Sequence, residues 1–172
     1  EGVAGGFVSG FTHPLFGIDH VVAMVAVGLW GGILGKPAVW ALPVTFPIVM
    51  AFGGVLGIRD IPVPGIEIGI ALSGLVLGIM VAAFARPPVF IAAVLVGVFA
   101  IFHGHAHGSE LPESATPIAY GAGFVISTGL LHAAGITLGL LLAWEWGDKF
   151  VRVCGAIVSC AGIYFLVGAI TT

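Results

Sequence analysis

The sequence predicts an all-α polytopic membrane protein with six transmembrane helices and both termini outside. Of its 172 residues, 59% are hydrophobic and only 8% are charged, and the mean hydropathy is +1.21. A spanning helix needs about 20 apolar residues, and six apolar stretches of that order are present. They occupy residues 13–35, 38–58, 62–85, 88–107, 116–144 and 150–171. Because the connections are short, residues 1–172 are predicted to form a single transmembrane domain.

Prolines and glycines indicate how these six segments begin and pack. A proline lies near the start of most stretches, where its missing amide N–H does least harm. These prolines are Pro14, Pro37, Pro62, Pro87, Pro88 and Pro117. Glycines recur at four-residue spacing inside the stretches, as in Gly28/Gly32 and Gly53/Gly57. Small residues so spaced let helices approach closely in lipid, so we expect a tightly packed bundle.

The basic residues predict the orientation of the bundle. Lys36, Arg86, Lys149 and Arg152 lie in the first, third and fifth connections, and only Arg59 lies in an even-numbered one. Cytoplasmic connections carry the excess of lysine and arginine. The odd-numbered connections are therefore predicted to be cytoplasmic, which places both termini outside.

The start of the chain supports the same orientation. Glu1–Gly6 lacks the basic start and apolar core of a signal sequence. We expect either that a signal peptide has been removed or that the chain has been trimmed. Removal of a signal peptide would leave the N-terminus in the periplasm of a bacterium, with the protein in the inner membrane.

The first chemistry-bearing cluster is His13-Pro14-Leu15-Phe16-Gly17-Ile18-Asp19-His20. On a helix, His13, His20 and Met24 share one stripe, whereas Asp19 points roughly 100° away. Asp19 therefore either hydrogen-bonds the distal nitrogen of a ligating histidine or reaches the metal itself through local unwinding at Gly17. A helix cap at His13 beside one buried polar pair is the structural alternative. Two histidines and an aspartate in eight residues favour a metal site.

The second cluster is Phe102-His103-Gly104-His105-Ala106-His107-Gly108-Ser109-Glu110. In a continuous helix, His103, His107 and Glu110 line one face, and His105 faces the other way. His105 and the following Glu113 are candidates for first capture of an ion from the outer water. A solvated histidine loop is the structural alternative, but the acidic residues that follow argue against it.

Two isolated polar residues extend a candidate path. Glu67 begins the third segment and His132 lies in the middle of the fifth. For His132 a packing role is as plausible as a pathway role. With outward termini, His13, His20, His103 and Glu67 converge on the outer half of the bilayer, and His132 lies deeper. Ionisable groups within a membrane are costly and usually functional.

Imidazole and carboxylate ligands without cysteine suit Ni²⁺ or Co²⁺, and Zn²⁺ shares these preferences. The expected partners are therefore a divalent metal ion and the lipid bilayer. Five basic residues scattered over the connections exclude a nucleic-acid partner. No phosphate-binding G-x-x-x-x-G-K-[ST] motif is present in the sequence. A resident cofactor is not expected.

These two motifs resemble those of the HupE/UreJ family of hydrogenase and urease accessory proteins, which are regarded as nickel or cobalt permeases. The resemblance covers nearly the whole chain and implies the metal ligands His13, Asp19, His20, His103, His107 and Glu110. It also implies hydrogenase or urease maturation proteins as partners. The family is similar to NiCoT transporters, which carry His-x4-Asp-His. Here five residues separate His13 from Asp19, so that class's coordination geometry does not carry over.

The expected function is import of a divalent metal, collected by His105, His107 and Glu113 and passed inward by Met24, Glu67 or His132. One alternative is a membrane protein that binds or delivers metal without transporting it. The other is an enzyme. Ser73-Gly74 is faintly similar to a rhomboid protease motif, but Ala71 replaces the expected glycine. A zinc-dependent lipid hydrolase needs only histidine and aspartate near the outer interface.

Overall fold

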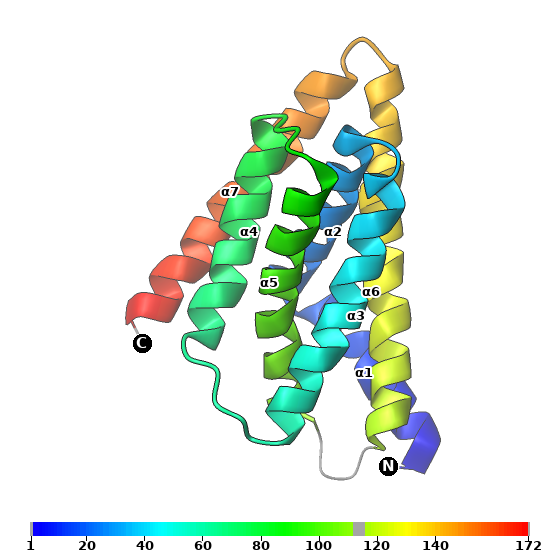
Figure 1. Cartoon of the computed structure of the whole chain (residues 1–172), viewed down its shortest axis with the longest axis vertical. Helices are drawn as coiled ribbons and strands as arrows, with labels where there is room; N and C mark the ends of the chain where they lie inside the picture. Colours follow the sequence, from blue (N-terminus) through cyan, green and yellow to red (C-terminus); the bar gives the residue numbers. More distant parts are fainter. Residues whose placement is uncertain (1, 112–115, 172) are drawn as a thin grey trace.

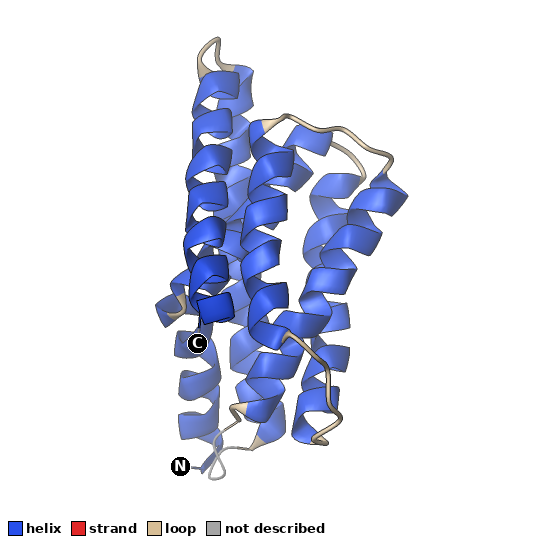
Figure 2. Ribbon diagram, turned by 90° about the vertical axis from the view of Figure 1, so that its left-hand side faces the viewer, coloured by secondary structure: helices blue, strands red, loops and turns tan. Residues whose placement is uncertain are grey.

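The computed structural model describes residues 2–111 and 116–171, and all regular structure within these ranges is helical. The predicted all-α class is therefore confirmed. In order, the helices are α1 (Gly2–Phe16), α2 (Ile18–Leu34), α3 (Ala38–Ile58), α4 (Ile66–Ala82), α5 (Val89–Ser109), α6 (Pro117–Gly139), the short 3₁₀ helix η1 (Leu140–Ala143) and α7 (Gly147–Thr171). They form one elongated bundle (Figure 1, Figure 2). Glu113, a predicted capture residue, lies outside the described residues.

Four of these segments are long and apolar enough to cross a membrane: α3, α5, α6 with η1, and α7. Helices α1 and α2 together make a fifth candidate that is broken and bent by 80°. Helix α4 is apolar but has only 17 residues, because the chain at 61–65 is not helical and Phe84 has φ of 57°. The protein is a helical membrane protein, and the predicted count of six spans stays a prediction.

The first predicted segment differs most from the structure. Helix α1 begins at Gly2, well before the expected start at residue 13, and the chain breaks at Gly17. Gly17 is extended, with φ −81° and ψ 101°, and caps the start of α2. Pro14 cannot donate to the preceding turn, so α1 is already weakened where it ends. The local unwinding considered for Asp19 is therefore present.

Close helix contacts are made where glycines lack a side chain. A Cβ added at any of these positions would collide with the backbone of the neighbouring helix. Such contacts pair Gly10 with Tyr120 (α1–α6), Gly28 with Gly135 (α2–α6), Gly104 with Met50 (α3–α5) and Gly78 with Gly155 (α4–α7). Van der Waals contact at small residues is a main source of helix association in lipid. It holds α5, which carries three histidines, tightly against α3.

The connections divide between the two ends of the bundle. The α2–α3, α4–α5 and α6–α7 connections lie at one end, and the α3–α4 connection lies at the other, toward which both chain termini point (Figure 1). Lys36, Arg86 and Lys149 belong to the first end and Arg59 to the second. The odd-numbered connections, which carry most of the basic residues, thus lie at the opposite end of the bundle from Arg59, as the orientation prediction requires. Which end faces outward stays a prediction.

Candidate metal centre

Four imidazole rings from α1, α2 and α5 form a continuous array. The ring centroids of His13 and His107 are 4.7 Å apart, those of His107 and His20 are 4.4 Å apart, and those of His20 and His103 are 4.6 Å apart. We call His13, His107, His20 and His103 the histidine array. The break at Gly17 makes it possible, because it turns α1 away from the axis of α2 while both helices keep a histidine facing α5.

The outer part of the array has the composition of a metal site. One ligand atom from each of His13, His107 and Glu110 can be chosen so that all three lie within 4.8 Å of one another. Ligands at about 2.0–2.2 Å from a transition metal lie at most about 4.4 Å apart, so small side-chain rotations would close this set on an ion. His13 Nε2 already lies 3.3 Å from Glu110 Oε2. The side chain of Glu110 is 55% exposed and that of His13 is 35% exposed, whereas His107 is buried.

Asp19 supports His20. The Oδ1 atom of Asp19 lies 3.0 Å from His20 Nδ1, where it accepts a hydrogen bond from that nitrogen. A neutral imidazole has one N–H and one lone pair, so this bond leaves the lone pair on Nε2. Within residues 2–111 and 116–171, His20 Nε2 is buried and has no hydrogen-bond partner. A carboxylate behind a ligating histidine commonly fixes its tautomer and orientation.

His103 ends the array and is fully buried. Its Nε2 lies 2.8 Å from the hydroxyl oxygen of Ser73 on α4. Its Nδ1 has no partner among the residues that the structure describes. In the sequence Ser73 is notable only as part of a protease-like motif, and this contact is not predicted. The signal available was a hydroxyl within an otherwise apolar helix, but nothing in the sequence pairs that hydroxyl with α5.

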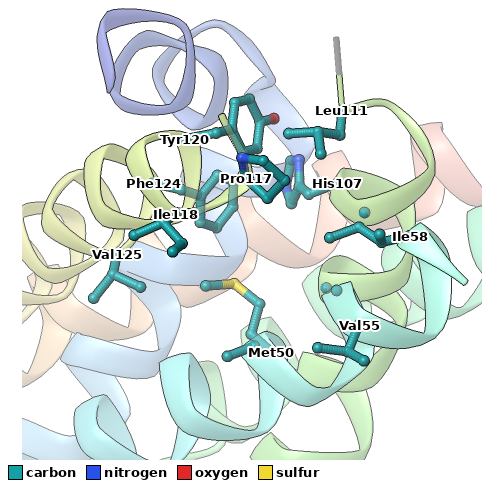
Figure 3. Close-up of a pocket in the computed structure, with 15 residues that line it drawn as sticks. Met50, Val55, Ile58, His107, Leu111, Pro117, Ile118, Tyr120, Phe124 and Val125 are labelled. Carbon is teal, nitrogen blue, oxygen red and sulfur yellow. The ribbon is translucent and has the colours of Figure 1, made fainter. Parts of the chain in front are cut away.

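An apolar cavity of ≈ 280 Å³ opens beside His107, between α3, α5 and α6. Figure 3 shows His107 at its inner wall with Tyr120 and Phe124, while Met50 and Val55 line the opposite side. The rings of His107 and Phe124 have centroids 4.1 Å apart. Neither nitrogen of His107 finds a hydrogen-bond partner in the described part of the chain. Its lone pair is therefore not occupied by a donor from the residues that the structure describes.

His105 does not join the array. As its position two residues after His103 predicts, it faces away, and its Nε2 donates a hydrogen bond of 2.9 Å to the carbonyl oxygen of Ile61 in the α3–α4 connection. That bond fastens the connection to α5. His105, a candidate capture residue, is thus hydrogen-bonded to the backbone through its Nε2 atom.

The remaining candidates lie apart from one another. Glu67 is exposed and lines a second cavity of ≈ 540 Å³ together with Asp19 and residues at the end of α7. Met24 is fully buried in the apolar core. Asp19 therefore stands between the cavity that contains Glu67 and the histidine array, to which it is bonded through His20.

His132 on α6 and His103 of the array contact the same aromatic ring. The centroid of the Phe46 ring is 5.5 Å from that of His103 and 5.5 Å from that of His132. Pro47 lacks the N–H that would bond to the Pro43 carbonyl in α3, and the backbone of Pro43 approaches the His132 ring. No hydrogen bond of standard geometry forms there, so both nitrogens of His132 lack a partner within the described ranges.

Comparison with known proteins identifies the family of this chain. Residues 1–165 match the family model described as HupE / UreJ protein. The chain is 47% identical to Protein HupE of Rhizobium leguminosarum bv. viciae over 165 residues, which cover 96% of this chain and 86% of the relative. The chain belongs to the HupE/UreJ family. The family consists of hydrogenase and urease accessory proteins. No solved structure matches the chain.

Proposed function

We propose that the protein is a permease that imports Ni²⁺, and also Co²⁺, across the bacterial inner membrane through the histidine array. The observation that carries the proposal is the array itself. Four imidazoles, two of them held by a carboxylate or a hydroxyl, run from the partly exposed His13 to the fully buried His103. Each neutral imidazole offers one lone pair, which a borderline metal such as Ni²⁺ prefers to hard oxygen ligands.

The exposed end of the array is the proposed point of capture. Glu110 supplies negative charge at the surface, and His13 lies 3.3 Å from it. An ion held there by His13, Glu110 and His107 would exchange its water for protein ligands. The next imidazole, His20, lies within ring contact of His107. The ion can thus be passed between overlapping ligand sets and need not be released into an apolar core.

Asp19 contributes charge as well as orientation in this proposal. A dication in a low-dielectric interior is strongly destabilised unless anionic groups are close. Asp19 touches His20 and also lines the cavity that contains Glu67. These two carboxylates therefore supply a second negative approach to the array, in addition to that of Glu110.

The inward route continues past Phe46 to His132. Because the Phe46 ring packs against both His103 and His132, we expect passage to need movement of that ring or of α3. Two prolines, Pro43 and Pro47, weaken the backbone hydrogen bonding of α3 at this level. Such a barrier would prevent an open aqueous path while the outer site is loaded.

The membrane potential is a sufficient driving force. With the orientation predicted above, a dication moving inward gains about 4.6 kcal/mol per 100 mV. That corresponds to a concentration ratio on the order of a thousandfold. Import of this kind would supply metal to hydrogenase or urease maturation proteins, the partners proposed for this chain. Zn²⁺ shares the ligand preferences and is the natural competitor in any measurement.

Radiotracer nickel uptake into proteoliposomes that contain only this chain tests the proposal. We expect accumulation inside the vesicles that follows an imposed negative-inside potential and is lost in His107→Ala. His105→Ala is the matched control, since His105 lies on the same helix and is bonded to a backbone carbonyl. Saturable nickel binding without metal in the lumen would instead indicate a binding or delivery protein. Release of a lipid product would indicate a hydrolase.

A further inference from the structure

We propose that Ser73 is a positioning residue that sets the tautomer of His103, so that His103 presents its Nδ1 atom to the metal. The inference rests on the proposed metal site and names how one of its ligands is held. Ser73 lies on α4, which is outside the elements that carry the histidine array. Its side chain and that of His103 are both fully buried.

The direction of the hydrogen bonds follows from the number of protons available. The hydroxyl oxygen of Ser73 lies 2.6 Å from the carbonyl oxygen of Ile70 and 2.8 Å from His103 Nε2. A carbonyl oxygen has no hydrogen, so the short contact with Ile70 requires the serine hydroxyl to donate its only proton there. The contact with His103 then needs a donor on the imidazole. Nε2 of His103 therefore carries the hydrogen.

The second nitrogen of His103 is left as a free lone pair. A neutral imidazole with hydrogen on Nε2 has its lone pair on Nδ1. That atom is buried and has no partner among the described residues. The His20 ring meets the His103 ring edge to face, at 87°. The unpartnered Nδ1 is thus available to an ion at the deep end of the array.

His20 and His103 are consequently held in opposite ways. Asp19 occupies Nδ1 of His20 and leaves Nε2 free, whereas Ser73 occupies Nε2 of His103 and leaves Nδ1 free. The Nδ1 atom lies closer to the backbone than Nε2, so binding through Nδ1 keeps an ion close to α5. Because Ser73 belongs to α4, its hydrogen bond to His103 also couples the position of α4 to the buried end of the site.

The same geometry argues against Ser73 as a nucleophile. A serine nucleophile donates its proton to a histidine that acts as base. Here the serine donates to Ile70 and accepts from His103, which is the reverse direction. Despite the faint similarity of Ser73-Gly74 to a protease motif, Ser73 therefore fixes the tautomer of His103 and does not act as a nucleophile.

The test is nitrogen NMR of histidine-labelled protein in nanodiscs at neutral pH, without metal. The signal of His103 is assigned by its loss in His103→Gln. We expect wild-type His103 to have hydrogen on Nε2, and Ser73→Ala to shift the population toward hydrogen on Nδ1. Ser73→Thr, which keeps a hydroxyl, should restore the wild-type pattern. Wild-type His103 with hydrogen on Nδ1 would overturn the inference without any variant.

Nickel binding provides the second readout. Loss of a group that orients a metal ligand typically weakens affinity by 10-fold to 100-fold, so we expect Ser73→Ala to weaken nickel binding about tenfold. Ser127→Ala is the matched control, because Ser127 is also fully buried and has no hydrogen-bond partner within the described ranges. We expect its affinity to stay within about twofold of wild type.

The outcomes separate this inference from the proposed function. If wild type binds nickel but does not transport it, the permease proposal fails while the tautomer result stands. If Ser73→Ala keeps both the wild-type tautomer and the wild-type affinity, the inference fails while transport is unaffected. Labelling of Ser73 by a serine-reactive fluorophosphonate would identify it as a nucleophile and would also overturn the inference.

Discussion

His20 and His103 meet edge to face, with ring centroids 4.6 Å apart, although they belong to helices α2 and α5. One nitrogen of each ring is hydrogen-bonded, that of His20 to Asp19 and that of His103 to Ser73. The free nitrogen of each ring is buried and unpartnered within residues 2–111 and 116–171. Buried polar atoms in folded proteins nearly always have partners. Two lone pairs left free at one place are consistent with the proposed metal site.

Removing an array imidazole should abolish metal binding. His107→Ala removes a ligand from the set formed with His13 and Glu110, and we expect nickel affinity to fall by at least about 100-fold. His105→Ala should change affinity less than about threefold, because its Nε2 is bonded to Ile61. Isothermal titration of purified protein measures both. Equal losses in the two variants would contradict the assignment of the site to one face of α5.

Removing the charge behind His20 should weaken binding without preventing folding. In Asp19→Asn, an amide can donate to Nδ1 of His20 and stabilise the wrong tautomer. We expect about tenfold weaker nickel binding. The control is Asp60→Asn, since Asp60 is exposed and its φ of 52° suits asparagine equally well. Wild-type affinity in Asp19→Asn would remove Asp19 from the site.

Crowding the α3–α5 contact should destabilise the protein and disturb the array. A Cβ at Gly104 would collide with the Met50 carbonyl, so Gly104→Ala must push apart the helices that hold His103 and His107 in place. Overpacking of this kind costs about 1–3 kcal/mol. Gly129→Ala is the control, because open space surrounds that position. Thermal unfolding in detergent should show a lower midpoint only for Gly104→Ala.

Uptake should fall as the external pH falls below about 6. A metal binds the neutral imidazole, so protons compete with the metal for the histidine ligands as the pH falls. Initial nickel uptake at a clamped membrane potential should therefore drop steeply between about pH 7.5 and 5.5. A flat profile over this range would contradict histidine ligation.

His132 should affect transport more than binding. His132 contacts Phe46 and is not part of the ligand set formed by His13, His107 and Glu110, so His132→Ala should leave nickel affinity within about twofold of wild type. If it lies on the inward route, initial uptake should fall about tenfold. Thr137→Ala on the same helix is the control, since Thr137 is exposed and bonded to its own helix. Unchanged uptake in His132→Ala would assign this residue to packing.

The helical membrane class and the family motifs could be predicted from the sequence, whereas the metal-binding chemistry stays a proposal. Apolar length and composition are local properties, and α3 in particular has the predicted bounds. The common face of His103 and His107 follows from helical spacing. The outward-turned His105 follows from the same periodicity. Each of these features depends on residues within one helix.

Contacts between helices required the tertiary structure. The break at Gly17 turns His13 and His20 toward α5, and straight-helix spacing could not predict it. The hydrogen bond from His103 to Ser73 depends on how α4 packs beside α5, which the residue spacing within either helix does not predict. The contact of the Phe46 ring with both His103 and His132 is likewise set by packing. Sequence periodicity determines which side of a helix a residue occupies. The residue that it contacts there depends on how closely the two helix backbones approach, and glycine contacts such as that of Gly104 with Met50 control this approach.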